Sequence, residues 1–549
     1  IFSGNDLGNK ITFNNPGFEL KEINKNGSTF FKPEMNNAGS MSSSGDPFLP
    51  SVSTYYLVEP GKRYSVNVIV KNKEVINNVD LGYVDSWDSQ ENNVGFPSEI
   101  NTNATIIYPA DLAVVSEPII MRDVVVVQLT ITPFQYNADS KELTVIHELD
   151  VELHEAGEIA QPFMPAKKSR AFEPFYESLI VNHQTINREI TEYQKPSILY
   201  VLPSNIGNLL SVVEELFDWK RRVGYEVNYV SSSNVVNNKN NLKNYIENAY
   251  ETWENPPEYV TIIGDAEGSY DIPTWNESWS GYYGEGDHPY SQLEGNDQYP
   301  EVFLGRISFD PQSHLTTQIS KLLNYESSPY MGENWFTRAC LAGDPSTSGI
   351  SCVITNEHIH EILDLVGFND VNTIYSGSFP NQMTSGITEG ISFFNYRGYY
   401  GVSGFESDDV NNTSNGFMLP VATVITCGTG SFASGESLIE DFTRAGTASN
   451  PKGSVVCIGT ATLGTHTMFN NVVDMGFYYG GLIEGISSAG GALMYGKMML
   501  HRYYPTNPND FANIFTHWNN LIGDASLQMW SAYPKQLNAS HVYSATLGT

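Results

Sequence analysis

The chain has 549 residues, with 62 Asp and Glu against 29 Lys and Arg, which gives a formal net charge of −33. This length allows about two to four domains with sizeable cores. A content of 40% hydrophobic residues is typical of a globular protein rather than a disordered one. The negative charge disfavours binding to nucleic acid or to an anionic membrane surface, and it offers carboxylates to divalent cations. No run of about eighteen apolar residues occurs, so the sequence predicts no membrane span.

The start of the chain and its cysteines bear on the cellular compartment. The chain begins at Ile1 rather than Met, which is typical of a mature or trimmed product and leaves export open. Its 4 cysteines are too few and too scattered for a disulfide framework or a zinc site. Cys340 and Cys352 could pair in an oxidising compartment, which would leave Cys427 free.

The first part of the chain, up to about residue 190, has the patterning of strands. Segments 64–70, 123–132 and 143–153 alternate apolar and polar residues. The turn signal at 137–140 predicts a hairpin between the last two segments, in an antiparallel sandwich or barrel. A Pro- and Lys-containing stretch at 161–171 leaves this module, and the apolar spacing of 172–182 predicts a helix that packs against the next one.

After about residue 190, short apolar runs alternate with amphipathic helical patterns. Unpatterned runs of this length are typical of buried parallel strands. The repetition predicts an α/β fold with a doubly wound, mostly parallel sheet and helices on both faces. The runs are 198–202, 259–263, 339–342, 391–394, 422–425 and 454–458.

Polar, titratable and glycine residues follow these predicted strands. In an open α/β sheet, ligands bind at the carboxyl ends of the strands, so these residues are expected to converge on one site. They are Asp265, Asp344, the loop 395–401, Cys427 and the loop 464–466. Because Cys427 lies between an apolar run and a Gly-rich turn, it suits a nucleophile beside an oxyanion site. The alternative is a buried Cys that acts as a small hydrophobe.

An ordered set of motifs in residues 195–535 resembles the gingipain-type cysteine peptidases of the caspase-like clan. The motifs are Ile-Ile-Gly-Asp at 262–265, Glu-Gly-Asn-Asp-Gln-Tyr-Pro-Glu-Val-Phe-Leu-Gly-Arg at 294–306, Asn-Tyr-x-Gly at 395–398, Leu-Pro before Cys427, and Leu-Ile-Gly-Asp-Ala-Ser-Leu at 521–527. The resemblance implies a caspase-like peptidase domain at 191–535, with subdomains at about 191–330 and 331–535. The β-rich residues 1–190, linker included, resemble the family's prodomain. Residues 536–549 resemble a tail or the start of a further β-module.

The resemblance assigns the catalytic Cys to Cys427 and an oxyanion donor to Gly428, but the chain departs from the family at the catalytic His. The family's His follows Asn-Tyr-x-Gly, and here Tyr399 stands in that position. A Tyr with an ordinary pKa near 10 is a poor base at neutral pH. His466 could polarise the thiol, line the substrate pocket or be a surface His. Asp344 lies near the family's carboxylate that orients the catalytic His, and its role is open.

The resemblance also bears on metal binding and on substrate preference. It implies a structural Ca²⁺ site, because five residues match the family's calcium ligands: the side chains of Asp265, Asp297 and Glu301, and the main-chain carbonyls of Glu294 and Tyr299. Hard oxygen ligands in such a set are what Ca²⁺ prefers. The alternative is that Asp297 caps a turn and Glu301 pairs with Arg306. Residues 351–353, where arginine-specific members of the family carry an acid, have none, so arginine preference is not implied.

Two functions remain open at this point. The first is a secreted or cell-surface cysteine endopeptidase that acts on protein or peptide substrates. The second is a pseudopeptidase that keeps the fold as a binding or assembly module on the cell surface, where secretion or surface-attachment machinery is a further expected partner. The Cys427 turn favours the first function, and Tyr399 favours the second.

Overall fold

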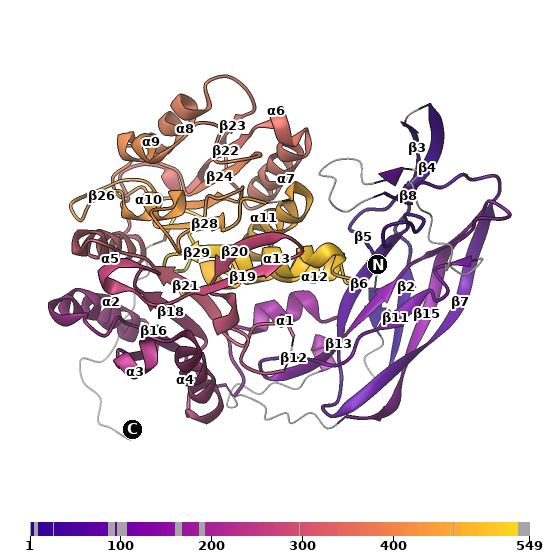
Figure 1. Ribbon diagram of the computed structural model, residues 1–549, viewed down its shortest axis with the longest axis horizontal. Coiled ribbons are helices and arrows are strands. Elements are labelled where there is room, and N and C mark those ends of the chain that lie inside the picture. The colour runs from indigo at the N-terminus through magenta and orange to yellow at the C-terminus, as the bar shows by residue number, and fades with distance from the viewer. Residues whose placement is uncertain are drawn as a thin grey trace.

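The computed structural model describes residues 2–4, 9–25, 27–85, 94–95, 107–159, 167–185, 193–295, 297–464 and 466–535. A β-rich N-terminal part lies beside a larger α/β part (Figure 1). Most of the predicted linker at 161–171 and the whole tail at 536–549 lie outside the described residues. No helix in the described ranges is long and apolar enough to cross a membrane.

The N-terminal part contains two antiparallel sheets around one apolar core. The six-stranded sheet consists of β1 (Phe2–Gly4), β2 (Lys10–Asn14), β7 (Lys62–Ile76), β10 (Ile107–Tyr108), β14 (Phe134–Asn137) and β15 (Glu142–Glu158). The five-stranded sheet consists of β5 (Gly39–Ser40), β6 (Pro50–Leu57), β11 (Ala113–Val115), β12 (Ile119–Met121) and β13 (Val124–Ile131). Two smaller strand pairs are β3 (Glu19–Lys25) with β4 (Ser28–Glu34), and β8 (Tyr83–Val84) with β9 (Val94–Gly95).

The predicted hairpin at 137–140 forms, but with a different first strand. The Asn137 side chain accepts hydrogen bonds from the N–H groups of Asp139 and Ser140, and this turn joins β14 to β15. The segment predicted as the partner of β15 is β13, which pairs with β6 in the other sheet. Every residue of β13 is buried, because the strand packs on both faces.

The C-terminal part is built on a ten-stranded sheet in the order β17-β16-β18-β21-β29-β28-β25-β24-β22-β23. β29 runs parallel to β21 and antiparallel to β28, whereas the other neighbouring pairs are parallel. The two halves of the sheet therefore point in opposite directions. The strands are β16 (Ser197–Val201), β17 (Glu226–Val230), β18 (Tyr259–Ile263), β21 (Phe303–Ile307), β22 (Arg338–Gly343), β23 (Asp370–Ile374), β24 (Phe393–Arg397), β25 (Val421–Val424), β28 (Val456–Thr460) and β29 (Asn519–Ile522).

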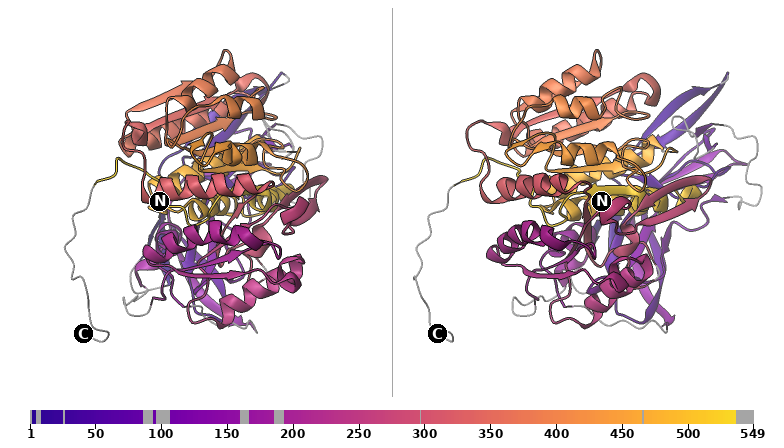
Figure 2. Two further views of the ribbon diagram at one scale, coloured as in Figure 1. Left: turned by 90° about the vertical axis from the view of Figure 1, so that its left-hand side faces the viewer. Right: turned by 60° about the vertical axis from the view of Figure 1, so that its left-hand side comes forward.

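Helices cover both faces of this sheet (Figure 2), as predicted. Alternate residues of β16 enter different cores: Tyr200 packs in the core that holds α2, and Leu199 in the core that holds α4. The helices are α1 (Glu173–Leu179), α2 (Leu210–Arg222), α3 (Ser233–Val236), α4 (Lys239–Thr252), α5 (Gln312–Ser327), α6 (Pro345–Ser348), α7 (Ser351–Leu365), α8 (Phe379–Thr388), α9 (Ser407–Asn412), α10 (Leu438–Arg444), α11 (Thr467–Leu482), α12 (Ala489–Tyr503) and α13 (Phe511–Trp518). Two further strand pairs are β19 (Trp275–Trp279) with β20 (Tyr282–Gly286), and β26 (Gly446–Thr447) with β27 (Asn450–Pro451).

All four cysteines are buried free thiols, so the structure contains no Cys340–Cys352 disulfide. Cys340 is on β22, and Cys352 is in the first turn of α7, where its sulfur lies 4.0 Å from the carbonyl oxygen of Gly398. Burial raises the pKa of both thiols, which keeps them protonated and unreactive.

The turn between β12 and β13 joins the two parts of the chain. Arg122 lies in this turn with φ +53°, and its guanidinium is fully buried in the C-terminal part. It donates hydrogen bonds to the carbonyl oxygens of Pro257 at 2.9 Å and Glu301 at 2.5 Å. Nearby, the hydroxyls of Tyr55 and Tyr299 lie 2.7 Å apart. The N-terminal part therefore packs directly against the segment that was expected to bind calcium.

Candidate active site

Four loops of the C-terminal part meet at one edge of the sheet. β22, β24, β25 and β28 are adjacent and parallel, so Asp344, the loop 398–401, Cys427 and the loop after β28 share their carboxyl edge. β18 belongs to the half that runs the other way. The prediction that Asp265 joins this group is therefore wrong, because Asp265 lies at the opposite edge of the sheet.

Cys427 directly follows β25 and is 4% exposed. Its backbone forms a parallel β-bridge with Tyr400, and its carbonyl oxygen accepts a hydrogen bond from the N–H of Gly401 at 3.3 Å. The Thr426 hydroxyl donates to the carbonyl oxygen of Gly401 at 2.7 Å. The loop after β24 thus packs along the Cys427 turn and fixes its backbone.

Gly428 was predicted as an oxyanion donor, but its N–H group already has an acceptor. It donates to the carbonyl oxygen of Thr462 at 2.8 Å. The residue has φ +74°, which favours glycine, and a Cβ at this position would lie 3.0 Å from Cδ2 of Leu463. Since one N–H makes one good hydrogen bond, this conformation does not offer the Gly428 amide to a substrate oxygen.

His466 occupies the N-cap position of α11 and is buried. Its ring centroid lies 5.0 Å from that of Phe469 and 5.1 Å from that of Phe511. The imidazole is thus seated among aromatic rings under the start of the helix, and the third alternative of the sequence analysis, a surface His, is wrong. Thr465, in the same loop, lies outside the described residues.

Asp344 forms the N-cap of α6 and lies in a hydrogen-bond network with two serines. Its carboxylate accepts from the Ser346 N–H at 2.9 Å and from the Ser403 hydroxyl, which also contacts the Tyr396 hydroxyl at 2.6 Å. Burial alone would raise the pKa of Asp344, but the hydrogen bonds from Ser403 and Ser346 lower it below its usual value. The carboxylate is therefore ionised at neutral pH and holds the loop that carries Tyr399 and Tyr400, whose side chains are exposed.

The β19–β20 hairpin completes the surroundings of the Cys427 turn, a role that was not predicted from the sequence. Gly284 forms an antiparallel bridge with Thr462. Glu285 is buried, and its carboxylate accepts the N–H of Ala433 at 3.1 Å, six residues after Cys427. Aromatic residues on both sides of Ser280 and Gly281 are a hairpin signal in the sequence, although nothing local links this hairpin to Cys427.

A groove of about 470 Å³ lies between this hairpin and the loop after β28. Its lining includes Glu277, Tyr283 and Glu285 from the hairpin, Ser431 from the segment after Cys427, and Leu463. The groove is therefore directly beside the Gly428 turn, over which Leu463 packs.

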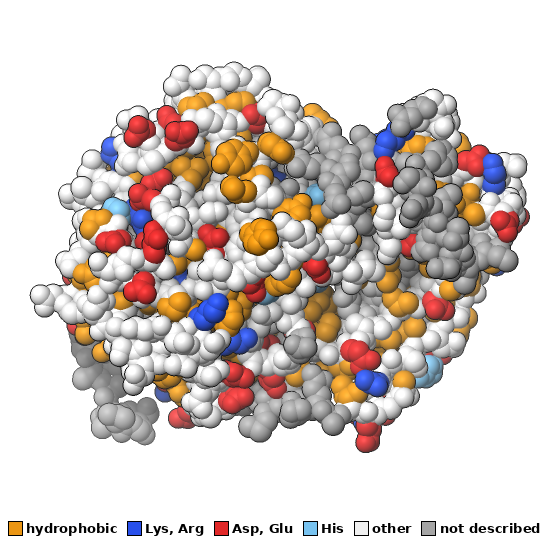
Figure 3. Space-filling view, viewed as in Figure 1, with side chains coloured by type: hydrophobic (Ala, Val, Ile, Leu, Met, Phe, Trp, Pro, Cys, Tyr) orange, Lys and Arg blue, Asp and Glu red, His pale blue; other side chains and the backbone are white. Residues whose placement is uncertain are grey.

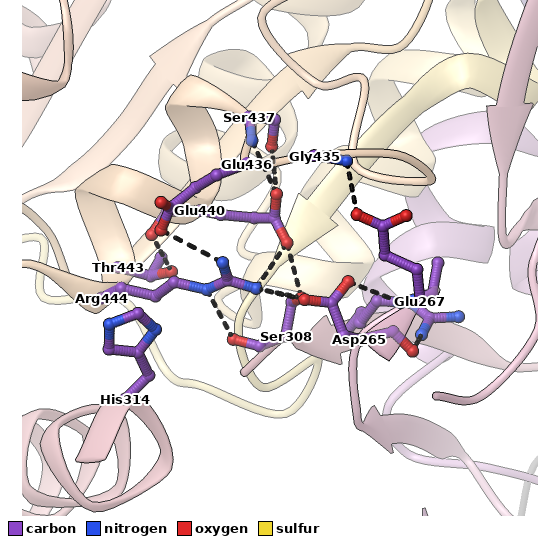
Figure 4. Close-up of polar contacts among 12 residues, drawn as sticks. Asp265, Glu267, Ser308, His314, Gly435, Glu436, Ser437, Glu440, Thr443 and Arg444 are labelled. Carbon is purple, nitrogen blue, oxygen red and sulfur yellow. Dashed lines mark hydrogen bonds and ion pairs between the residues drawn. The ribbon is translucent and has the colours of Figure 1, made fainter. Parts of the chain in front are cut away.

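The segment after Cys427 ends in α10, where a buried charge network binds it to the other half of the sheet (Figure 4). Arg444 pairs with Asp265 and Glu440 at 2.7 Å each, and with Glu436 at 3.1 Å. Glu440 accepts the Ser308 hydroxyl at 2.6 Å. Asp265 follows β18 and Ser308 follows β21, so Arg444 joins α10 to the ends of both strands.

The five residues expected to bind calcium do not meet. In the register of β18 and β21, Tyr259 is opposite Phe303 and Ile263 is opposite Ile307. Asp265 follows the end of this pair and Glu301 precedes its start, so the two are at least about 13 Å apart along the strands. Asp265 is instead bound to Arg444.

The other four residues form a compact segment next to the N-terminal part. Asp297 accepts the N–H of Tyr299 at 2.9 Å, and Glu301 accepts the N–H of Leu293 at 2.7 Å. Burial raises the pKa of Asp297 to about 7, and burial together with Asp297 raises that of Glu301 well above its usual range. The Glu301 Oε1 atom is buried without a hydrogen-bond partner in the part of the chain that the structure describes.

The two buried carboxylates of Asp297 and Glu301 suit a bound cation, because they repel each other until a positive charge lies between them. The ligand set is incomplete, since the described ranges contain no group of three or more His, Cys, Asp or Glu side chains arranged to hold a metal ion. The residues that could hold Ca²⁺ are therefore Asp297 and Glu301, with the carbonyls of Glu294 and Tyr299.

Two families match nearly the whole chain. The one described as Peptidase family C25 covers residues 191–530, and Propeptide_C25 covers residues 3–189. The chain belongs to peptidase family C25. It is therefore a gingipain-like member of a cysteine peptidase family, in which the residues that match the family's propeptide precede the peptidase domain.

Relatives and solved structures agree with this assignment. Gingipain R2 of Porphyromonas gingivalis (strain ATCC BAA-308 / W83) is 25% identical over 84% of this chain and 64% of its own length. Gingipain R1 of the same species is 24% identical over 82% of this chain and 46% of its own length. The chain thus spans less than two thirds of these relatives.

The crystal structure of the Arg-specific cysteine proteinase gingipain R (RgpB) has a TM-score of 0.54 at 24% identity, over 62% of this chain and 79% of that one. The complex of P. gingivalis RgpB pro- and mature domains has a TM-score of 0.55 at 23% identity, over 62% and 81%. These likenesses confirm the predicted caspase-like α/β fold.

Proposed function

We propose that this chain is a peptide-binding member of the gingipain-like family with little or no hydrolytic activity. It keeps the thiol at the end of β25 and a groove beside it, and its ligands are peptide segments of other proteins. We favour a catalytically impaired protein over an active endopeptidase because the polar groups near Cys427, among them the Gly428 N–H and the Asp344 carboxylate, already form hydrogen bonds within the protein.

The observation that carries this proposal is the hydrogen bond from the Gly428 N–H to the Thr462 carbonyl oxygen at 2.8 Å. Loss of one oxyanion donor costs about 10²- to 10³-fold in rate in enzymes of this chemistry. The carboxylate of Asp344, expected near a catalytic His, is bound by Ser403 and Ser346. Tyr399, which stands in the position of the family's catalytic His, is 45% exposed and has no imidazole to offer the Cys427 thiol.

The test compares the parent protein with Cys427→Ala on an unstructured protein substrate and on a peptide library. We expect equal rates of hydrolysis, because Cys427 contributes nothing measurable, and we expect both proteins to bind peptides from the library. Hydrolysis by the parent that exceeds the Cys427→Ala rate a hundredfold would contradict the proposal.

The second candidate is an active cysteine endopeptidase with Cys427 as nucleophile and His466 as base. The position of Cys427 at the mouth of a parallel half-sheet, beside a groove, favours it. In that case Cys427→Ala and His466→Ala would both lower the rate by about 10²- to 10⁴-fold, since an essential base contributes that much. Equal rates in the parent and in His466→Ala would remove the imidazole from the mechanism.

We place the protein outside the cytoplasm, secreted or at the cell surface, with secretion or attachment machinery as a further partner. This part of the proposal rests on the likeness to gingipains and on the propeptide. Fractionation of the native organism with an antibody against the α/β part tests it, and a purely cytoplasmic signal would overturn it.

A further inference from the structure

Large apolar side chains stand exposed around the Cys427 turn. Tyr283 is 73% exposed, Leu463 69%, Tyr400 64% and Tyr399 45%. Single exposed apolar residues are common on proteins, but a group of them beside a groove marks a binding surface. Figure 3 shows patches of apolar side chains, with acidic side chains around them, on the face of the α/β part where Figure 1 labels β19 and β20.

Separate segments carry these side chains to the same place. Leu463 packs over Gly428, Tyr400 forms the β-bridge with Cys427, and Tyr283 lines the groove together with Leu463. These side chains are exposed even though the whole chain is present, so the described residues of the N-terminal part do not cover them.

The charges of the groove decide which peptides suit it. Its charged lining residues are Glu277 and Glu285, with no described Lys or Arg among them. Glu277 contacts His517 at 2.8 Å, and Glu285 accepts the Ala433 N–H at 3.1 Å, so each carboxylate already has a partner inside the protein. An acidic peptide would meet negative charge, and a basic side chain would have to compete with those partners.

We infer that the groove beside Cys427 selects peptide segments by a large aliphatic or aromatic side chain, which packs between Leu463 and Tyr283, and that it excludes acidic segments. This inference rests on the proposed function and adds its substrate class. Leu463 and Tyr283 are the residues that determine the preference.

The experiment uses the full chain as Cys427→Ala, so that hydrolysis cannot affect the result. Labelled short peptides of Gly and Ser with one central Leu, Phe, Arg or Glu are titrated by fluorescence anisotropy. We expect the Leu and Phe peptides to bind about tenfold more tightly than the Arg peptide, and the Glu peptide to bind most weakly. Adding Leu463→Ala or Tyr283→Ala should remove most of the tenfold preference.

Matched controls are Leu365→Ala and Tyr229→Ala. Leu365 is 78% exposed at the far end of α7, and Tyr229 is 43% exposed on the edge strand β17. Both controls should keep the preference. If the Arg or Glu peptide binds as tightly as the Leu peptide, or if the controls act like Leu463→Ala, the inference is wrong while the proposed function stands. If no peptide binds at all, the proposed function fails with it.

Discussion

At the scale of single residues, the side chains around Cys427 form hydrogen bonds with residues far away in the sequence, which no local sequence pattern predicts. Glu285 is the clearest case, because it is buried on β20 and its carboxylate accepts the N–H of Ala433 from the segment after Cys427. Burial raises the pKa of Glu285, and the nearby charge of Asp287 adds to this, although the Ala433 hydrogen bond opposes it. Folding therefore disfavours the ionised form.

We predict that Glu285→Gln makes the protein more stable than the parent at high pH. A raised pKa in the folded state means that the stability contribution of Glu285 is complete below the usual value of 4.5 and is lost as pH rises through the raised value. Gln keeps an acceptor for Ala433 and carries no charge. The melting temperatures should agree near pH 4.5 and separate in favour of the variant toward pH 8.

Two controls bracket this result. Glu285→Ala leaves the Ala433 N–H without an acceptor and should lose about 1 to 3 kcal/mol at every pH. Glu214→Gln, at an exposed Glu on α2, is the matched control for the removal of one carboxylate from the chain. A Glu285→Gln protein that is less stable than the parent at pH 8 would show that the charge itself is needed.

At the scale of elements, the sequence predicted the strands that begin in or contain a short, mostly apolar run of residues. The six predicted runs coincide with or overlap β16, β18, β22, β24, β25 and β28. There are physical reasons why the other strands of the sheet were not predicted. β17 and β23 are the outermost strands of the sheet and are partly exposed, so they carry no apolar run. β21 and β29 contain buried polar residues, such as Arg306 and Asn520, that find partners only in the folded chain.

The direction of the strands limited the prediction of the site. Reasoning from strand ends placed Asp344 and Cys427 at one edge, where the structure has them. Because β29 runs antiparallel to β28, the strands on the two sides of this pair run in opposite directions. No local pattern in Asn519–Ile522 predicts this change of direction. Asp265 therefore lies at the opposite edge, where it forms an ion pair with Arg444.

We predict that Arg444→Met destabilises the protein by about 3 to 5 kcal/mol at pH 8, because it leaves Asp265 and Glu440 buried without their cation. The loss should be smaller at pH 5. Burial raises the pKa of Glu440 to about 7, so this carboxyl is protonated at pH 5 and needs no partner charge. Unfolding in denaturant at the two pH values measures the difference.

Arg221→Met is the matched control, since Arg221 forms an exposed pair with Asp218. Such pairs contribute less than about 1 kcal/mol. Hydrogen exchange adds a readout specific to the element: α10 should lose protection in Arg444→Met and keep it in Arg221→Met. An equal loss of stability at both pH values would mean that Glu440 stays ionised in the variant.

At the scale of the whole molecule, the N-terminal part and the α/β part meet at the segment 294–301. The Ile120 N–H of the N-terminal part donates to the Asp297 carboxylate at 3.4 Å, and Arg122 donates to the carbonyl oxygen of Glu301. A cation bound by Asp297 and Glu301 would add to contacts that already join the two parts. Removal of such a cation should therefore loosen the whole chain rather than one loop.

We predict that Ca²⁺ raises the melting temperature of the parent and that a chelator reverses the rise, because a ligand bound only by the native state stabilises it by mass action. At a concentration one hundred times the dissociation constant, the gain is about 2.7 kcal/mol. Asp297→Asn should abolish the rise. Asp265→Asn should lower the melting temperature, because it disrupts the Arg444 network, yet keep the rise with Ca²⁺. If Asp265→Asn abolishes the rise as well, the assignment of the calcium site to the segment 294–301 is wrong; if the parent shows no rise, the prediction of a calcium site fails altogether.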